Sequence, residues 1–423
     1  MRLRAGLLRP RAWALALALL ARETPLAAQS TFDAIFDLRL LGSDARTVWL
    51  DAGLDKQRFG HDDQPLALGA ALFDLDAHLT PTLSVRATAA AYDATSALLH
   101  VTETYLDLAP APHSAWRWRA RAGLFYPPVS VENTGVAWTS PYTLSFSSIN
   151  TWIAEEIRAQ GGEVELTHLG RLSESPHDLG FAAAVFRGND PAGALLSWRG
   201  WSLHDRQSGL FERLPLAPLP AFASGGSFFP VQQAFEKPFV ELDGRWGYYA
   251  ALRWNYLDWS EVRALHYDNL GDPSVVKGGQ WAWRTRFDHL AWHWRPAAGT
   301  DVLVQALLGD TEMDGFTGPL VDARFWAAYA LASRELGRHR WSARIDVFGV
   351  RDDDSTPDDP NQEHGTGATA AYFYRLPAGR FGAEWRLGGE LSLIRSARPA
   401  RRLVGDAEER TETAAQLSAQ LRF

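Results

Sequence analysis

The segment Trp116–Phe125, WRWRARAGLF, alternates between apolar and charged side chains over most of its length. Its two tryptophans fall on one face, and Arg117, Arg119 and Arg121 fall on the other. Because successive side chains of a β-strand point to opposite faces, this pattern predicts a strand with one apolar side and one charged side. About ten residues is also the length that a tilted strand needs to cross a bilayer.

A long connection follows this strand and ends at a second alternating segment, Gly162–Thr167. The connecting residues are rich in Trp, Tyr, Phe, Ser and Asn, and Trp152–Arg158 has the pattern of a short helix. Long, ordered connections of this kind are usually functional. We therefore expect an inserted loop over residues 126–160 that folds into the mouth of a barrel and narrows a pore.

The same alternation recurs along the chain and is clearest in the last segment, 411–423. About seventeen segments qualify as strands, including 47–56 and 236–246, while 260–279 is interpreted as a long loop. Bacterial single-chain barrels have even strand numbers, so we expect about sixteen strands, with eighteen as the alternative. On this view the first two segments merge or form an N-terminal plug.

The predicted fold class is therefore all-β: a transmembrane antiparallel β-barrel with an inward-folded constriction loop. A secreted soluble β-protein is the alternative, because its strands also alternate. Two features argue against it. Most strands carry charge on their polar face, and they are longer than the strands of ordinary sandwiches.

Composition supports a barrel and narrows the chemistry. The chain has 423 residues, a formal net charge of -8 and no cysteine, which excludes thiol catalysis, cysteine-bound metals and disulfides. It holds 18 Trp, 21 Phe and 11 Tyr at a mean hydropathy of only -0.21, as expected for aromatic girdles around a polar interior. The charge balance does not favour nucleic acid as a partner.

The N-terminus has the pattern of a secretory signal peptide. Several arginines precede the apolar run Ala12–Ala21, and small residues follow at Ala27 and Ala28. The alternative is an amphipathic helix of the mature fold. We expect residues 1–28 to be cleaved and 29–423 to form an outer-membrane barrel with inserted loops 126–160 and 189–235.

Charged residues on the polar faces are candidates for lining the pore, because rings of charge set ion preference. An alternative is that these charges pair across neighbouring strands and only keep the lumen wet. The arginine ladder at 117–121 gives a hint of anion preference. The predicted pore-lining and constriction residues are Arg117, Arg119, Arg121, Glu155, Glu156, Arg158, Glu163, Glu165, Arg344 and Arg386.

The sequence offers little support for acid–base catalysis or for a bound metal ion. Glu155 and Glu156 could act as paired acids, but no histidine or nucleophile lies near them in sequence. The acidic run 351–361 lacks the spacing of a calcium loop and is more typical of a solvated connection. His289 and His293 share a strand face without a zinc motif. We expect no catalytic residues, no metal, no cofactor and no enzymatic activity.

These features resemble Gram-negative outer-membrane porins. The closing amphipathic strand that ends in Phe423 is shared by that class. More narrowly, RAGLFYPPVSVEN, a long loop and then EEIRAQGGEVEL resemble the phosphate-selective porin (O and P type) superfamily over about 50 residues. The matching positions are Gly123, Phe125, Pro128, Ser130, Glu132, Arg158 and Gly161 or Gly162.

The resemblance implies a sixteen-stranded barrel, often a homotrimer, with its third loop folded inward. The lysine-rich arrangement that this family uses for phosphate is absent, so phosphate selectivity is not implied. We expect a channel in the cell outer membrane for passive diffusion of small polar or charged solutes, in contact with lipids and lipopolysaccharide. The alternatives are a polysaccharide-assembly or glycan-binding barrel and an enzyme with its site at the barrel rim.

Overall fold

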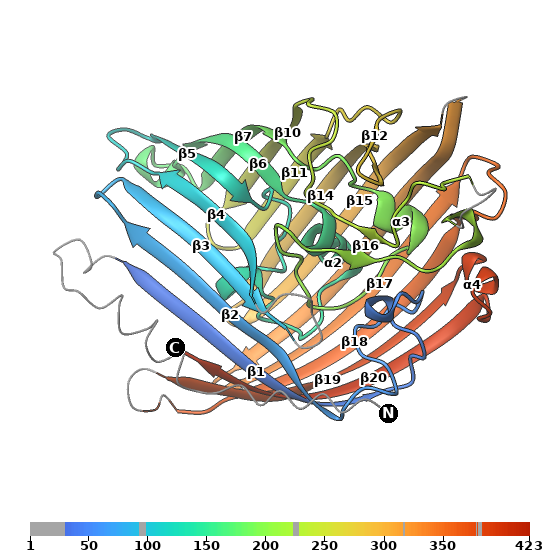
Figure 1. Ribbon diagram of the computed structural model, residues 1–423. Helices are drawn as coiled ribbons and strands as arrows, with labels where there is room; N and C mark the ends of the chain where they lie inside the picture. Colours follow the sequence, from blue (N-terminus) through green and yellow to red (C-terminus); the bar gives the residue numbers. More distant parts are fainter. Residues whose placement is uncertain (1–29, 93–98, 223–227, 316–317, 378, 380–382) are drawn as a thin grey trace, which may run out of the picture.

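The protein is a closed antiparallel β-barrel. The computed structural model describes residues 30–92, 99–222, 228–315, 318–377, 379 and 383–423 (Figure 1). Sixteen strands form the wall, each paired with its neighbour in chain order, and β20 closes the ring against β1. The predicted fold class and strand number are confirmed. The expected signal peptide, residues 1–28, lies outside the described residues.

The wall strands are β1 (Thr31–Ser43), β2 (Leu66–His78), β3 (Leu83–Ala91), β4 (His100–Leu108), β5 (Trp116–Phe125), β6 (Ala159–His168), β7 (His177–Arg187), β10 (Gly247–Tyr256), β11 (Ser260–Asp268), β14 (Arg284–Ala297), β15 (Thr300–Gly315), β16 (Gly318–Leu336), β17 (His339–Asp352), β18 (Glu363–Arg375), β19 (Glu384–Ala397) and β20 (Glu409–Arg422). Two small sheets lie outside the wall: β8 (Leu214–Pro215) with β9 (Phe235–Glu236), and β12 (Val276–Lys277) with β13 (Gln280–Trp281). The helices are α2 (Ser148–Glu156), α3 (Ala194–Trp198) and α4 (Ala400–Leu403), with short 3-10 turns at Trp49–Asp51, Val136–Trp138, Gly170–Leu172 and Pro220–Phe222.

Three of the sequence expectations for individual strands are wrong. Segments 47–56 and 236–246 are not wall strands, and β11 occupies part of the expected loop 260–279. The inward face of β11 is charged only at its start, where Glu261 and Arg263 pair, and continues with the buried apolar residues Leu265 and Tyr267. Segment 47–56 instead folds inward, with Trp49 and Leu54 buried, which agrees with the expected N-terminal plug.

The long connections all leave the barrel at one end, which we call the long-loop end. They are 44–65 after β1, 126–158 after β5 and 188–246 after β7. The opposite, short-turn end has tight connections such as 298–299 and 337–338. No helix among the described residues is long and apolar enough to span a membrane.

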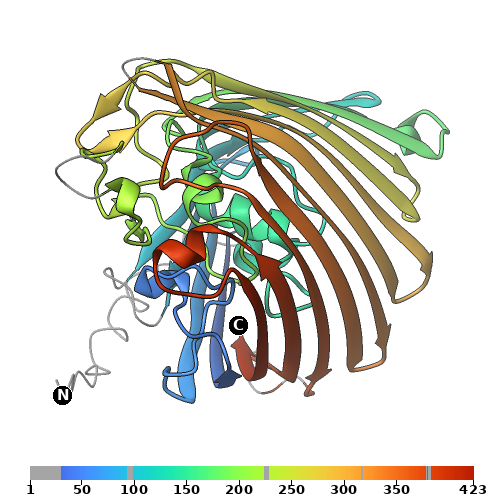
Figure 2. The ribbon, with the colours of Figure 1, turned by 90° about the vertical axis from the view of Figure 1, so that its right-hand side faces the viewer.

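The hydrophobic core lies inside the ring of strands. Figures 1 and 2 show α2 and α3 enclosed by the wall. Helix α2 packs against β15, β16 and β17, and the aromatic ring of Trp152 contacts those of Phe287 and Phe325. On the outer face, apolar residues such as Leu417 remain exposed. On its inner face, the wall from β14 to β18 packs against this core, although its inward side chains include polar groups such as Arg344 and Asp346.

Candidate permeation site

A polar cavity lies inside the barrel, on the side formed by β1–β7, β10 and β11. It consists of two adjoining spaces of 320 and 370 Å³, which share the lining residues Arg86, Glu103, Tyr105 and Trp138. We call it the vestibule. Toward the short-turn end its walls stay accessible: the side chain of Arg119 is 32% exposed.

Two residues of the arginine ladder of β5, Arg119 and Arg121, border this vestibule. Arg119 pairs with Asp107 on β4 (2.6 Å), and Arg121 pairs with Glu163 on β6 (2.7 Å). Glu165 lies opposite Arg119 in register but pairs with Arg253 of β10 (2.9 Å). Arg117 lies opposite Thr167 and points inward one step closer to the short-turn end.

The charges that line the vestibule balance. Five arginines and five carboxylates border it, and three of these arginines pair with further carboxylates beside it, namely Asp76, Asp107 and Glu261. This arrangement favours the cross-strand pairing that the sequence left open, and it weakens the hint of anion preference. The residues are Arg86, Arg119, Arg121, Arg253 and Arg263, with Asp33, Asp74, Glu103, Glu163 and Glu165.

The connection after β5 enters the barrel, and its helix α2 is completely buried. The side chain of Ser147 caps the helix by accepting a hydrogen bond from the Asn150 backbone N–H. Glu155 pairs with Arg199 and with His204 (3.1 Å). Burial alone would raise the pKa of Glu155, but these two partners outweigh it and hold the pKa at about 2.

Glu156 has a different environment from its neighbour. It accepts hydrogen bonds from the Leu195 N–H (2.9 Å), the Gly193 N–H (3.1 Å) and the Trp152 indole. No cation pairs with it among the described residues. Burial therefore raises its pKa to about 7, and Glu156 ties α2 to the start of α3.

Arg158 ends the inserted loop and is fully buried. Its guanidinium donates to the Ile153 carbonyl (2.8 Å), the Ala154 carbonyl (3.0 Å) and the Thr102 carbonyl of β4 (3.1 Å). It also stacks on the Tyr126 ring, 3.3 Å from the centroid. Arg158 thus joins the end of α2 to the wall and lies behind Tyr126, which borders the vestibule.

Arg344 and Arg386 also hold the inserted loop rather than border open space. Arg344 is fully buried and pairs with Glu132 of the loop and with Asp346 of its own strand, both at 2.8 Å. Arg386 lies over the Phe373 ring at 3.7 Å and donates to the Pro141 carbonyl (3.3 Å). Their role in a pore lining remains a prediction.

Sequence reasoning missed the second inserted segment as part of the site. The sequence predicts an inserted loop over residues 189–235 but assigns none of its residues to the site. In the structure, much of the connection 188–246 lies inside the barrel. Its stretch Gly200–Gly209, GWSLHDRQSG, is buried although most of it is polar. A polar run without strand or helix pattern is normally interpreted as solvated, so no sequence signal marks this placement.

This segment brings Ser202 and His204 to Glu155, a grouping that the sequence could not show. The same imidazole nitrogen, Nε2, faces both Ser202 Oγ (3.4 Å) and Glu155 Oε1 (3.1 Å). The other nitrogen, Nδ1, accepts the Arg206 backbone N–H (3.2 Å). A serine–histidine–acid relay needs the serine and the acid on different ring nitrogens, so this arrangement does not form one.

One group of described carboxylates is close enough to hold a metal ion. The ligand oxygens of Asp190, Glu241 and Asp243 lie within 4.8 Å of one another at the long-loop end. Each carboxylate already accepts backbone N–H groups; Asp190, for instance, accepts the N–H of Asp243 (3.1 Å) and of Leu242. The cluster orders the chain entering β10, and we assign no metal to it.

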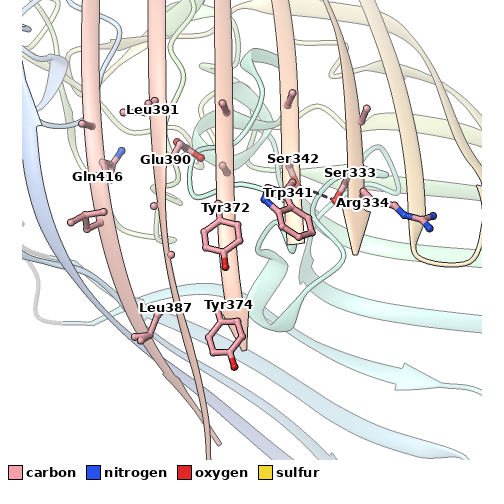
Figure 3. Close-up of a pocket in the computed structure, with 18 of the residues that line it drawn as sticks. Ser333, Arg334, Trp341, Ser342, Tyr372, Tyr374, Leu387, Glu390, Leu391 and Gln416 are labelled. Atoms are coloured by element: carbon pink, nitrogen blue, oxygen red, sulfur yellow. Dashed lines mark hydrogen bonds between the residues drawn. The ribbon is translucent and has the colours of Figure 1, made fainter. Parts of the chain in front are cut away.

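A separate apolar groove lies on the outside of the wall, over β16–β20 and β1 (Figure 3). Small residues form its floor, including Ala332, Ala343 and Ala370. The rings of Trp341 and Tyr372 flank it toward the short-turn end (Figure 3). Its apolar lining marks it as a lipid- or protein-facing surface rather than a route for polar solutes.

Comparison with known proteins places the fold. No protein-family model matches the sequence, and no curated protein matches it. The anion-selective porin from Comamonas acidovorans is 11% identical, with a TM-score of 0.53 over 93% of this chain and 99% of that one. The outer membrane channel DcaP of Acinetobacter baumannii is 8% identical, with a TM-score of 0.53 over 93% and 97%. The chain therefore has the barrel fold of outer-membrane porins.

Proposed function

We propose that the protein is an outer-membrane channel for passive diffusion of small polar or charged solutes, and not an enzyme. The observation that carries the proposal is a charge-lined vestibule inside a barrel whose outer face is largely apolar. The porin-like fold supports it. The resemblance of the region around β5 and β6 to phosphate-selective porins supports kinship with that superfamily without its selectivity.

The balanced charges of the vestibule suggest which solutes would pass. Each arginine lies beside a carboxylate, so the field is that of paired dipoles rather than of one sign. Such a wall offers hydrogen-bond donors and acceptors to uncharged and zwitterionic solutes alike. We therefore infer weak ion preference.

The outer face supports the membrane location and gives an orientation. Exposed aromatic side chains gather where strands meet the short-turn end, as in the girdles of membrane barrels. They are Trp116, Trp254, Tyr256, Trp259, Trp292, Trp294, Trp341, Tyr372 and Trp385. Because short turns of such barrels face the periplasm, the long-loop end would face outward, toward lipopolysaccharide.

Conductance in planar bilayers tests the channel. The purified barrel should give discrete current steps in salt solution. Deleting Gly135–Ser148, which borders the vestibule and runs into α2, should enlarge those steps because it removes part of the inserted loop. If neither the unmodified barrel nor the deletion variant gives current steps, the channel proposal is refuted.

We also propose that the barrel forms homotrimers through the outer groove. Its small floor residues would let a neighbouring wall approach closely, as small residues do between membrane helices. Ala370→Trp should fill the groove and shift the detergent-purified protein from trimer to monomer in light scattering. A protein that is monomeric without the substitution would indicate that lipid fills the groove.

A further inference from the structure

The stretch Gly200–Gly209, here called the strap, has an unusual combination of properties. It has no helix or strand, yet every one of its residues is buried. Five of its consecutive side chains, His204–Ser208, are polar or charged. Buried segments are normally apolar or regular, because irregular polar chain needs individual partners for each group.

The strap lies on the roof of the vestibule. The Tyr126 hydroxyl, which borders one space, donates to Gln207 Oε1 (2.8 Å). Gln207 Nε2 in turn donates to the carbonyl of Ala137, which borders the other space (2.8 Å). Only four residues further on, Phe211 is 91% exposed. The chain thus passes from the vestibule roof to solvent within a few residues.

Trp201 and Leu203, near the start of the strap, are buried in the hydrophobic core, where the Trp201 ring contacts those of Trp152 (6.0 Å between centroids) and Phe325 (6.3 Å). Ionic and polar contacts hold the rest of the strap, His204–Ser208. Asp205 pairs with Arg39 of β1 (2.6 Å) and with Arg58 of the 44–65 connection (2.9 Å). These two arginines outweigh burial and hold the pKa of Asp205 at about 2. The Ser208 N–H donates to the Ala154 carbonyl of α2 (3.0 Å).

The chain just before the strap is anchored differently. The Trp198 ring of α3 packs against those of Phe222 (4.8 Å between centroids), Phe229 (5.6 Å) and Trp283 (4.9 Å). Exposing this cluster would cost the full hydrophobic free energy of its area. Trp201 and Leu203 belong to the same apolar core as this anchor. Water can replace the partners of His204–Ser208, so displacing these five residues costs less than displacing the anchor.

The displaceable part therefore begins after Leu203, the last core residue of the strap, and ends at Gly209, whose backbone is less restricted than that of other residues. We propose that the strap carries the gate of the channel: His204–Ser208 close the long-loop end of the vestibule and swing out, between the anchored Leu203 and Gly209, to admit solute. This inference rests on the proposed channel function and adds to it a named moving part.

A cross-link tests the gate directly, and the chain contains no cysteine to interfere. Ser208→Cys and Ala154→Cys can be joined by oxidation or by a short bifunctional thiol reagent, with mass spectrometry to confirm the bridge. The control pair, Ala120→Cys with Val164→Cys, joins register partners on β5 and β6 instead. Bridging the strap should abolish the current and reduction should restore it, while the control bridge should leave it unchanged.

Two further variants complete the test. Asp205→Asn removes the carboxylate that pairs with Arg58 and one of the two that pair with Arg39, so the open fraction should rise about tenfold or more. Asp288→Asn, which removes an exposed carboxylate paired with His266, is its control and should have no effect. Deleting Ser202–Ser208 should give a permanently open channel. Heat-modifiable gel migration checks that each barrel folds.

The outcomes separate the two proposals. If the bridged protein conducts like the reduced one, or the deletion conducts like the unmodified chain, the strap is not the gate although the channel stands. If neither the unmodified chain nor the folded deletion variant conducts, the channel proposal fails and the gate fails with it.

Discussion

Replacing Glu165 with glutamine tests whether paired charges set the ion preference of the vestibule. Glu165 pairs with Arg253, and both side chains are partly exposed, at 19% and 31%. The substitution keeps the shape of the side chain but removes one of five lining carboxylates. The vestibule then carries one uncompensated positive charge, and the barrel should fold as before.

The size of the effect follows from Coulomb's law. A unit charge about 5 Å from a passing ion in a watery space contributes about 0.8 kcal/mol. Screening at about 0.1 M salt reduces this to about 0.5 kcal/mol. The energy has opposite signs for anions and cations, so their permeability ratio should change by about fivefold toward anions, since about 1.4 kcal/mol is a factor of ten.

The assay is the reversal potential under a salt gradient across a planar bilayer. Asp310→Asn is the matched control. Asp310 pairs with Arg286 on the outer face, so this substitution removes the same charge at a site away from the lumen. We expect a shift toward anions for Glu165→Gln and none for the control. Equal reversal potentials in both variants would refute the assignment of Glu165 to the ion path.

Two further predictions concern the inserted loop. Arg344→Met leaves Glu132 and Asp346 buried without their cation, which should destabilise the loop by about 3 kcal/mol or more and speed proteolysis within 126–158; unchanged protection would show that Arg344 does not hold the loop. The pKa of Glu156 is raised from 4.5 to about 7, so the folded protein keeps this proton where the unfolded chain loses it. Stability should therefore fall by about 3 kcal/mol as pH rises from about 4.5 to about 7, and Glu156→Gln should remove this slope in thermal unfolding; the same slope in the variant would contradict the assignment.

Most of the wall could be predicted because its inner and outer faces differ in polarity. This holds for β5 and β20, whose alternation marks each residue as outward or inward. It fails for β11, where Tyr267 faces a packed lumen rather than water. For 47–56 the sequence predicts a strand where there is none. Its apolar residues, such as Trp49 and Leu54, are buried inside the barrel and not on a strand of the wall.

In the candidate site, contacts between neighbouring strands could be predicted from the sequence, whereas contacts between the inserted loops could not. Arg121 and Glu163 lie directly opposite each other on the neighbouring strands β5 and β6, so the sequence could suggest that they pair. The contact of Glu155 with His204 joins positions 49 residues apart in segments without regular pattern. No periodicity reports such a contact, which depends on how two inserted loops fit together.

The double-sided packing of β14–β18 has a consequence for how the barrel moves. Lipid would cover this part of the wall outside, and the loop core covers it inside, so water reaches its backbone amides from neither face. The strands around the vestibule have water on their inner face. Hydrogen exchange should therefore divide the barrel into a slow, rigid half and a faster half, and breathing motions of the ring should concentrate in β3–β6, beside the route that solutes would take.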